Sequence, residues 1–189
     1  MEVKEQIKQY ISYNEQESKD KEMILKYIDL FDDVLTRNND IVHFTSSGFV
    51  LNEKRDKVLT IYHNIYNSWS WTGGHADGDS NFLNVAITEV QEETGVKNVK
   101  PIVEEIFTID VLTCIGHIKK GKYISPHIHV SVAYLLEANE NELIRVKEDE
   151  NSNVAWLSLD TFLEYVTEEQ MKPIYTKIIE KAKKRQLIK

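Results

Sequence analysis

Three glutamates near the end of one expected helix are the residues best suited to chemistry in this sequence. Glu89, Glu92 and Glu93 belong to the stretch 73–96, which passes from a paired-glycine turn into a helix. At about 100° per residue, the three side chains fall within one arc of roughly 100° beside a narrow apolar stripe. The pattern therefore predicts three carboxylates on one face of a helix that starts at Ser80 or Asn81.

Such a cluster is unfavourable without a positive partner. Like charges three or four positions apart each cost about 0.2–0.5 kcal/mol, and negative charge near a helix C-terminus opposes the helix dipole by roughly 0.3–1 kcal/mol more. A bound divalent cation makes the electrostatic energy of the cluster favourable. Mg²⁺ and Mn²⁺ commonly bind carboxylates together with substrate phosphates. For the three acids taken alone, a solvated acidic helix end is the simpler interpretation.

The whole stretch around the acids resembles the signature box of the Nudix hydrolases. That signature is a glycine, five residues, a glutamate, seven residues and then Arg-Glu-apolar-x-Glu-Glu-x-Gly-apolar. Its glycine corresponds to Gly74, its acidic run to Glu89–Glu93 and its closing glycine to Gly95. Two positions depart from it, because Ser80 stands in place of the first glutamate and Thr88 in place of the arginine.

The resemblance implies a divalent-metal-dependent hydrolase that cleaves a diphosphate linkage in a nucleotide or related small molecule by attack of water at phosphorus. It implies Glu89, Glu92 and Glu93 as ligands of Mg²⁺ or Mn²⁺, with Glu89 or Glu93 orienting the water. Some members of the family take the base from a loop ahead of a later strand, and Glu150 is our candidate there. Physically, the metal stabilises charge on phosphate oxygens and lowers the pKa of bound water.

The two departures leave an alternative open. A guanidinium can hold a carboxylate through two parallel hydrogen bonds, which threonine cannot do, so Thr88 leaves a glutamate ligand less well oriented. Ser80 removes one negative charge and offers a helix cap. The alternative is a catalytically weakened Nudix-like module that binds nucleotides or acts as a regulator.

Further candidates for substrate binding lie outside the acidic helix. Gly74 and His75 belong to the paired-glycine turn, where the backbone can approach a ligand closely. His127 and His129 lie on one face of an expected strand, and we expect that face to line a groove. The same two histidines suit a third possibility, a zinc-dependent enzyme, but the sequence places no third ligand beside them. Cys114 is expected to be a small buried hydrophobic residue.

The elements around these residues indicate an α/β fold. Residues 2–36 read as two helices joined by a turn at Asn14–Ser18. Strand patterns follow, first as a hairpin of 43–51 with 57–63, and later as one long strand over Tyr123–Ala138 after a turn at 119–122. The resemblance implies a Nudix-type α/β/α sandwich with a mixed sheet over residues 39–189. We expect residues 1–38 to form an N-terminal helical pair packed on that core. The pair could act as a lid, form a contact in a homodimer or simply contribute packing.

Composition limits the class of protein. A chain of 189 residues with 41% hydrophobic and 29% charged residues is typical of an ordinary globular domain. The net charge of −8 argues against a surface for nucleic acid duplexes, but not against a small nucleoside diphosphate-type substrate. No apolar run approaches the ~20 residues of a membrane span, and the N-terminal residues lack a signal-peptide core. With a single cysteine, these features predict a cytoplasmic protein without membrane partners.

Overall fold

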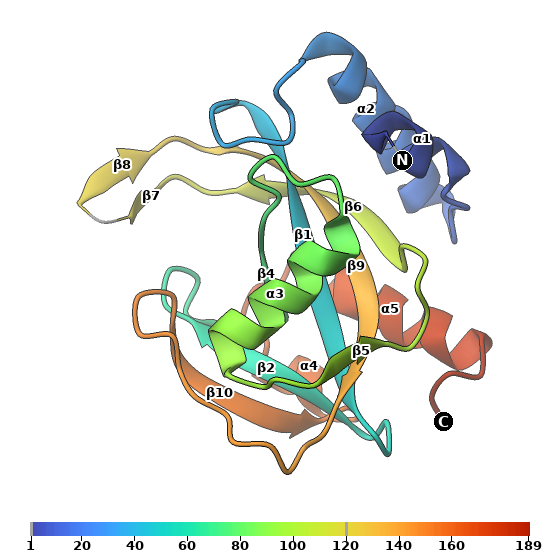
Figure 1. Cartoon of the computed structure of the whole chain (residues 1–189), viewed down its shortest axis with the longest axis vertical. Helices are drawn as coiled ribbons and strands as arrows, with labels where there is room; N and C mark the ends of the chain where they lie inside the picture. The colour runs from blue at the N-terminus through green and yellow to red at the C-terminus, as the bar shows by residue number, and fades with distance from the viewer. Residues whose placement is uncertain (1, 120) are drawn as a thin grey trace.

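A mixed sheet forms the middle of the computed structural model, which describes residues 2–119 and 121–189 (Figure 1). Its strand order is β10-β2-β1-β9-β5, while β3 pairs with β2, β4 with β1 and β6 with β9. A separate hairpin joins β7 to β8. The strands are β1 (Val42–Asn52), β2 (Lys57–His63), β3 (Ser68–Ser70), β4 (Thr72–His75), β5 (Val99–Pro101), β6 (Thr108–Cys114), β7 (His117–Lys119), β8 (Lys122–Ile124), β9 (His127–Ala138) and β10 (Asn151–Ser158).

The central pair β1 and β9 runs parallel, and the other pairings among the described strands are antiparallel. The two strands stay in register from Val42 beside Ile128 to Asn52 beside Ala138. Both are buried on their two faces over most of their length, as expected for strands in the middle of a covered sheet. This register decides which side chains of β1 and β9 meet.

Helices cover the two faces of this sheet (Figure 1). On one face, Val90 and Phe82 of α3 (Phe82–Thr94) pack in a core with Phe44 and Val130. On the other, a second core joins Phe49 to α4 (Phe162–Tyr165) and α5 (Lys172–Lys184). The predicted α/β/α sandwich with a mixed sheet is therefore confirmed.

The N-terminal helices are α1 (Val3–Gln9) and α2 (Glu15–Leu30); α2 packs beside β6, and α1 packs on α2 (Figure 1). Ile7 and Ile24 are fully buried in the same core as α3. The turn predicted at Asn14–Ser18 is wrong, because the side chain of Asn14 accepts a hydrogen bond from the backbone N–H of Glu17 and caps α2 there. The division of the chain at residue 38 stays a prediction.

The strand predicted over Tyr123–Ala138 is interrupted. It divides into β8, which ends at Ile124, and β9, which begins at His127. Pro126 lies between them and has no backbone N–H to donate to a ladder. The turn predicted at 119–122 includes residue 120, which lies outside the described residues.

Among the described helices, none combines the length and the apolar composition that crossing a bilayer requires.

Candidate active site

Helix α3 carries the three predicted carboxylates. The side chain of Asn81 accepts a hydrogen bond from the backbone N–H of Asn84, so Asn81 rather than Ser80 caps the helix. The helix ends at Gly95, whose φ of 78° is in the left-handed region that favours glycine. These two ends place the acidic run in the last two turns of α3.

The three carboxylates lie at different depths. Glu92 is exposed, Glu89 is partly buried, and Glu93 is only 2% exposed. One carboxylate oxygen of Glu93 accepts a hydrogen bond of 2.9 Å from the backbone N–H of Gly73 in β4. The solvated helix end that is the simpler interpretation of the acids alone therefore does not describe Glu93, because β4 covers that edge of the helix.

Burial makes the charged forms of two of these groups unfavourable. Loss of solvation raises the pKa of Glu89 to about 7, although the positive charge of Lys147 opposes the effect. Burial likewise raises the pKa of Glu93 to about 8, against the opposing hydrogen bond from Gly73. The negative charge of Glu150 adds to both shifts. A cation among these oxygens would favour the charged carboxylates.

The paired glycines of β4 leave room for this cluster. A Cβ atom at Gly74 would stand 2.1 Å from Oε1 of Glu89, and one at Gly73 would stand 2.4 Å from Oγ of Ser47. Neither position can therefore carry a side chain without displacing a neighbour. At Gly74 the neighbour is the carboxylate itself, so this glycine lets Glu89 lie directly against the backbone.

A lysine from the loop before β10 joins the cluster. The ammonium of Lys147 lies 3.1 Å from Oε2 of Glu92 and 2.9 Å from Oε2 of Glu150. Four residues later, the side chain of Asn151 donates a hydrogen bond of 3.0 Å to the backbone carbonyl of Glu93. The loop is thus attached to α3, and the candidate base Glu150 is brought to the same site.

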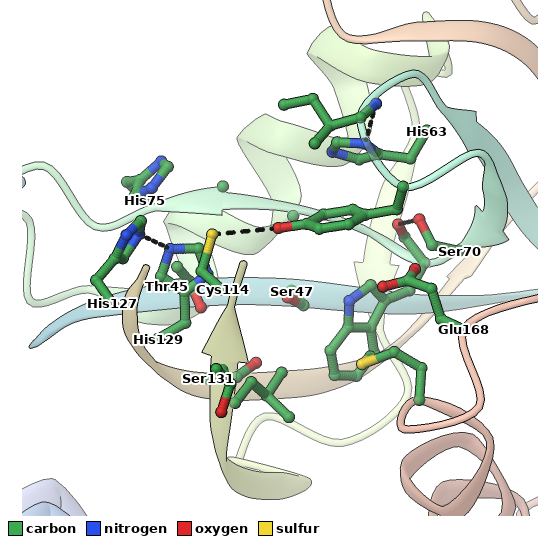
Figure 2. Close-up of a pocket in the computed structure, with 18 of the residues that line it drawn as sticks. Thr45, Ser47, His63, Ser70, His75, Cys114, His127, His129, Ser131 and Glu168 are labelled. Atoms are coloured by element: carbon green, nitrogen blue, oxygen red, sulfur yellow. Dashed lines mark hydrogen bonds between the residues drawn. The ribbon is translucent and has the colours of Figure 1, made fainter. Parts of the chain in front are cut away.

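These groups line one cavity of about 1480 Å³. Its size exceeds the roughly 300–1,000 Å³ of typical small-molecule sites, so it has room for a nucleotide. The predicted residues Gly74, His75, His127 and His129 all line it, as do the four acids. Figure 2 shows the three histidines gathered in one part of the cavity, with Glu168 in another.

Comparison with known proteins assigns the family. A family model described as the NUDIX domain matches residues 42–180, from the start of β1 into α5. The chain belongs to the Nudix family. The resemblance of the stretch 73–96 to the signature box is therefore confirmed, and the protein is a hydrolase of the class that acts on phosphorus-containing anhydrides.

Individual relatives agree with this assignment. The RNA pyrophosphohydrolase of Pelagibacter ubique (strain HTCC1062) is 29% identical over 142 residues, which cover 72% of this chain and 89% of that protein. A solved binary complex of the Ap4A hydrolase of C. elegans has a TM-score of 0.54 at 16% identity, covering 72% of this chain and 95% of that chain. A NUDIX family hydrolase from Clostridium perfringens has a TM-score of 0.51 at 21% identity, covering 73% of this chain and 96% of that chain. At these identities, the solved structures show the fold.

The two departures from the Nudix signature occupy different surroundings. The backbone carbonyl of Ser80 accepts a hydrogen bond of 3.0 Å from the side chain of Gln6, so this position lies where α1 contacts the loop before α3. Thr88 is an exposed residue within α3. The first of these positions is therefore part of the contact between the N-terminal helices and the Nudix box.

Nudix hydrolases generally need divalent metal ions, and the residues present fit one. The side-chain donors of Glu89, Glu92 and Glu93 are all carboxylate oxygens, which hard divalent cations prefer. The backbone at Gly74 leaves Glu89 in place where any side chain would push it away. Glu92 and Glu150 already bind one cation, the ammonium of Lys147, which a metal ion would have to displace from Glu92.

Several residues in or beside the cavity were missed by the sequence interpretation. Lys147 and Asn151 flank the acidic run 148–150, and the opposite charge of the lysine beside that run was the available signal. His43 and Cys114 lie beside His129 and His127 through strand pairing. No local pattern reveals these neighbours, because they come from strands far apart in the sequence.

Proposed function

We propose that this protein hydrolyses a diphosphate linkage in a nucleotide or related small molecule in a reaction that depends on Mg²⁺ or Mn²⁺. The observation that carries the proposal is that four acids, two of which share the ammonium of Lys147, line one nucleotide-sized cavity. Glu89, Glu92 and Glu93 come from α3, and Glu150 reaches them through the shared contact with Lys147. Carboxylates gathered in this way suit a metal that also binds substrate phosphates.

Each acid has a distinct role in this proposal. Glu89, Glu92 and Glu93 hold the metal, which when bound supplies charge stabilisation at phosphorus and a water of lowered pKa. Glu93 is the most firmly placed, because the N–H of Gly73 fixes one of its oxygens. Glu89 or Glu93 orients the attacking water, and Glu150 accepts its proton.

The substrate lies between the acidic wall and the histidines. Gly74 and His75 form one side of this space, and His127 and His129 form another part of its lining. The Pelagibacter relative is named an RNA pyrophosphohydrolase, which supports a phosphoanhydride on a nucleotide as the substrate class. The net charge of −8 favours a small nucleoside diphosphate-type substrate over a nucleic acid duplex. We also propose a cytoplasmic location; a homodimer stays a prediction.

The test is a panel of nucleoside diphosphate compounds assayed for phosphate release with and without Mg²⁺. Glu92→Gln and Glu93→Gln preserve shape but weaken the metal site, so we expect each to lower turnover by about 100-fold or more. Glu180→Gln, at an exposed position of α5, is the matched control and should leave turnover unchanged.

Two results would contradict the proposal. Turnover without added metal, or turnover insensitive to both α3 substitutions, would exclude these carboxylates as the metal site. Thermal stabilisation of the protein by the same compounds without any turnover would instead identify the weakened binding module.

A further inference from the structure

A cluster of histidines lies in the cavity, and it includes His43, which the hydrolytic proposal does not use. The parallel register of β1 and β9 places His43 beside His129, and β4 brings His75 next to Thr45, the second residue after His43. The ring centroid of His43 lies 5.0 Å from that of His75 and 5.0 Å from that of His129. The centroids of His75 and His129 are 5.2 Å apart. Three adjacent strands thus bring three imidazoles together, and Figure 2 shows His75 and His129 in the same part of the cavity.

His43 turns an unshared electron pair into this cluster. Its Nδ1 lies 2.8 Å from the backbone carbonyl of Asn39, and since a carbonyl only accepts, Nδ1 carries the proton. Nε2 is therefore the unprotonated nitrogen. The residue is only 3% exposed, and Nε2 has no hydrogen-bond partner within the part of the chain that the structure describes. A buried acceptor left in this way is costly unless something binds it.

The neighbouring His127 fixes which nitrogen of His129 is unprotonated. Its Nδ1 lies 2.8 Å from the backbone carbonyl of Ser125, so it too presents an unprotonated Nε2. That atom accepts a hydrogen bond of 3.0 Å from Nε2 of His129, so Nε2 of His129 carries the proton and its Nδ1 is the nitrogen with the unshared electron pair. Backbone carbonyls that accept from Nδ1 and thereby aim Nε2 are the outer contacts usually found behind metal-binding histidines.

The distances between the ligand nitrogens suit a metal ion with tetrahedral coordination. One ligand nitrogen each from His43, His75 and His129 all lie within 4.8 Å of one another. Around a zinc ion with Zn–N bonds of ~2.0–2.1 Å, such nitrogens stand roughly 3.3 Å apart, so small rotations of the side chains would close the site. Neutral imidazole favours Zn²⁺, whereas Mg²⁺ prefers the carboxylates of α3. The two sets of ligands therefore select different metals.

We propose that His43, His75 and His129 bind a zinc ion, separate from the metal site of the carboxylates. The fourth position opens toward the cavity, because His75 and His129 are only partly buried and line it. This position accepts water or an anionic oxygen of the ligand in the cavity. Zinc at this place adds positive charge to the histidine side of the cavity, opposite in sign to its acidic wall. The site does not require the hydrolytic activity.

The direct experiment is zinc binding to the full chain after treatment with a chelator. We expect about one tightly bound zinc per chain by elemental analysis, and a cobalt derivative with the visible absorption of a tetrahedral site. His43→Asn and His129→Asn should each lower zinc affinity by more than roughly tenfold, since the loss of an outer contact alone has that effect. His63→Asn is the matched control, because His63 lines the same cavity but does not belong to the cluster.

Further variants test the zinc site independently of folding and of the hydrolase proposal. If an interior histidine variant does not fold, His75→Asn at the partly exposed strand β4 replaces it as the test. Glu92→Gln should keep full zinc affinity, so a failure of the hydrolase proposal would not affect this result. Absence of zinc binding would overturn the proposal. So would binding that survives His43→Asn but is lost in Cys114→Ser, because it would place the ion between Cys114, His127 and His129.

Discussion

The ammonium of Lys147 lies 3.1 Å from a carboxylate oxygen of Glu92, so a side chain of the loop before β10 contacts the acidic end of α3. The same ammonium lies 2.9 Å from Glu150. This lysine therefore supplies positive charge to the acids that we propose as metal ligands and base. A divalent cation that binds Glu92 competes with Lys147 for the same oxygens.

Lys147→Met should consequently strengthen metal binding. The lost ion pair is partly exposed, so its contribution is about 0.5–1 kcal/mol and the gain in Mn²⁺ affinity about 2–5-fold. Titration calorimetry with Mn²⁺ measures the change directly. Lys54→Met, which alters an exposed lysine near Glu140, is the control. Weaker Mn²⁺ binding in Lys147→Met would show that the lysine supports the metal site instead of competing for it.

Gly74→Ala should disturb the site through Glu89. The added Cβ would stand 2.1 Å from the carboxylate, so Glu89 must move by about 1 Å or more, and displacements of that size commonly cost on the order of 100-fold in turnover. We expect the variant to remain folded but to lose thermal stability. In a Glu89→Ala background the clash is absent, so the same substitution should cost little stability. Equal losses in both backgrounds, measured by thermal unfolding, would exclude the clash as the cause.

Lys177→Met should destabilise the whole molecule. Lys177 of α5 is 5% exposed and lies 2.5 Å from Asp110 of β6 and 3.1 Å from Glu17 of α2. Removing the lysine leaves two buried carboxylates without their cation, which typically costs about 3–5 kcal/mol. Urea unfolding measures the loss. Lys183→Met, on an exposed position of the same helix, should change stability by less than about 0.5 kcal/mol.

Glu168 should make stability depend on pH. Burial raises the pKa of this carboxyl from 4.5 to about 7, so the folded state binds its proton more tightly than the unfolded state. The resulting stabilisation is complete below about pH 4.5 and is lost as the pH rises through about 7. Because the group is partly exposed, we expect a change of about 1–2 kcal/mol, less than the full shift implies. The difference in melting temperature between wild type and Glu168→Gln should change across this window; a constant difference would contradict the assignment.

Local patterns predicted much of the fold and part of the site. The helical spacing of Glu89, Glu92 and Glu93 and the ends of their helix follow from periodicity and from Gly95, because these depend on residues close together in the chain. The alternation in residues 127–138 likewise predicted which side chains of β9 share a face, and His127, His129 and Ser131 of that strand line the cavity. The patterns missed the interruption at Pro126, because the alternation of apolar residues continues across it.

By itself, then, the sequence determined the three carboxylates on α3 and the glycines that begin and end their box, and its resemblance to the Nudix box implied the sandwich class. Only the tertiary structure decided that Gly73 covers Glu93, that Lys147 joins Glu92 to Glu150, and that His43 lies beside His129. The physical reason is strand register. A shift of two residues between β1 and β9 would keep every side chain on its own face, so alternation cannot distinguish one pairing from another. The packing of the complete chain selects the pairing that brings the histidines together.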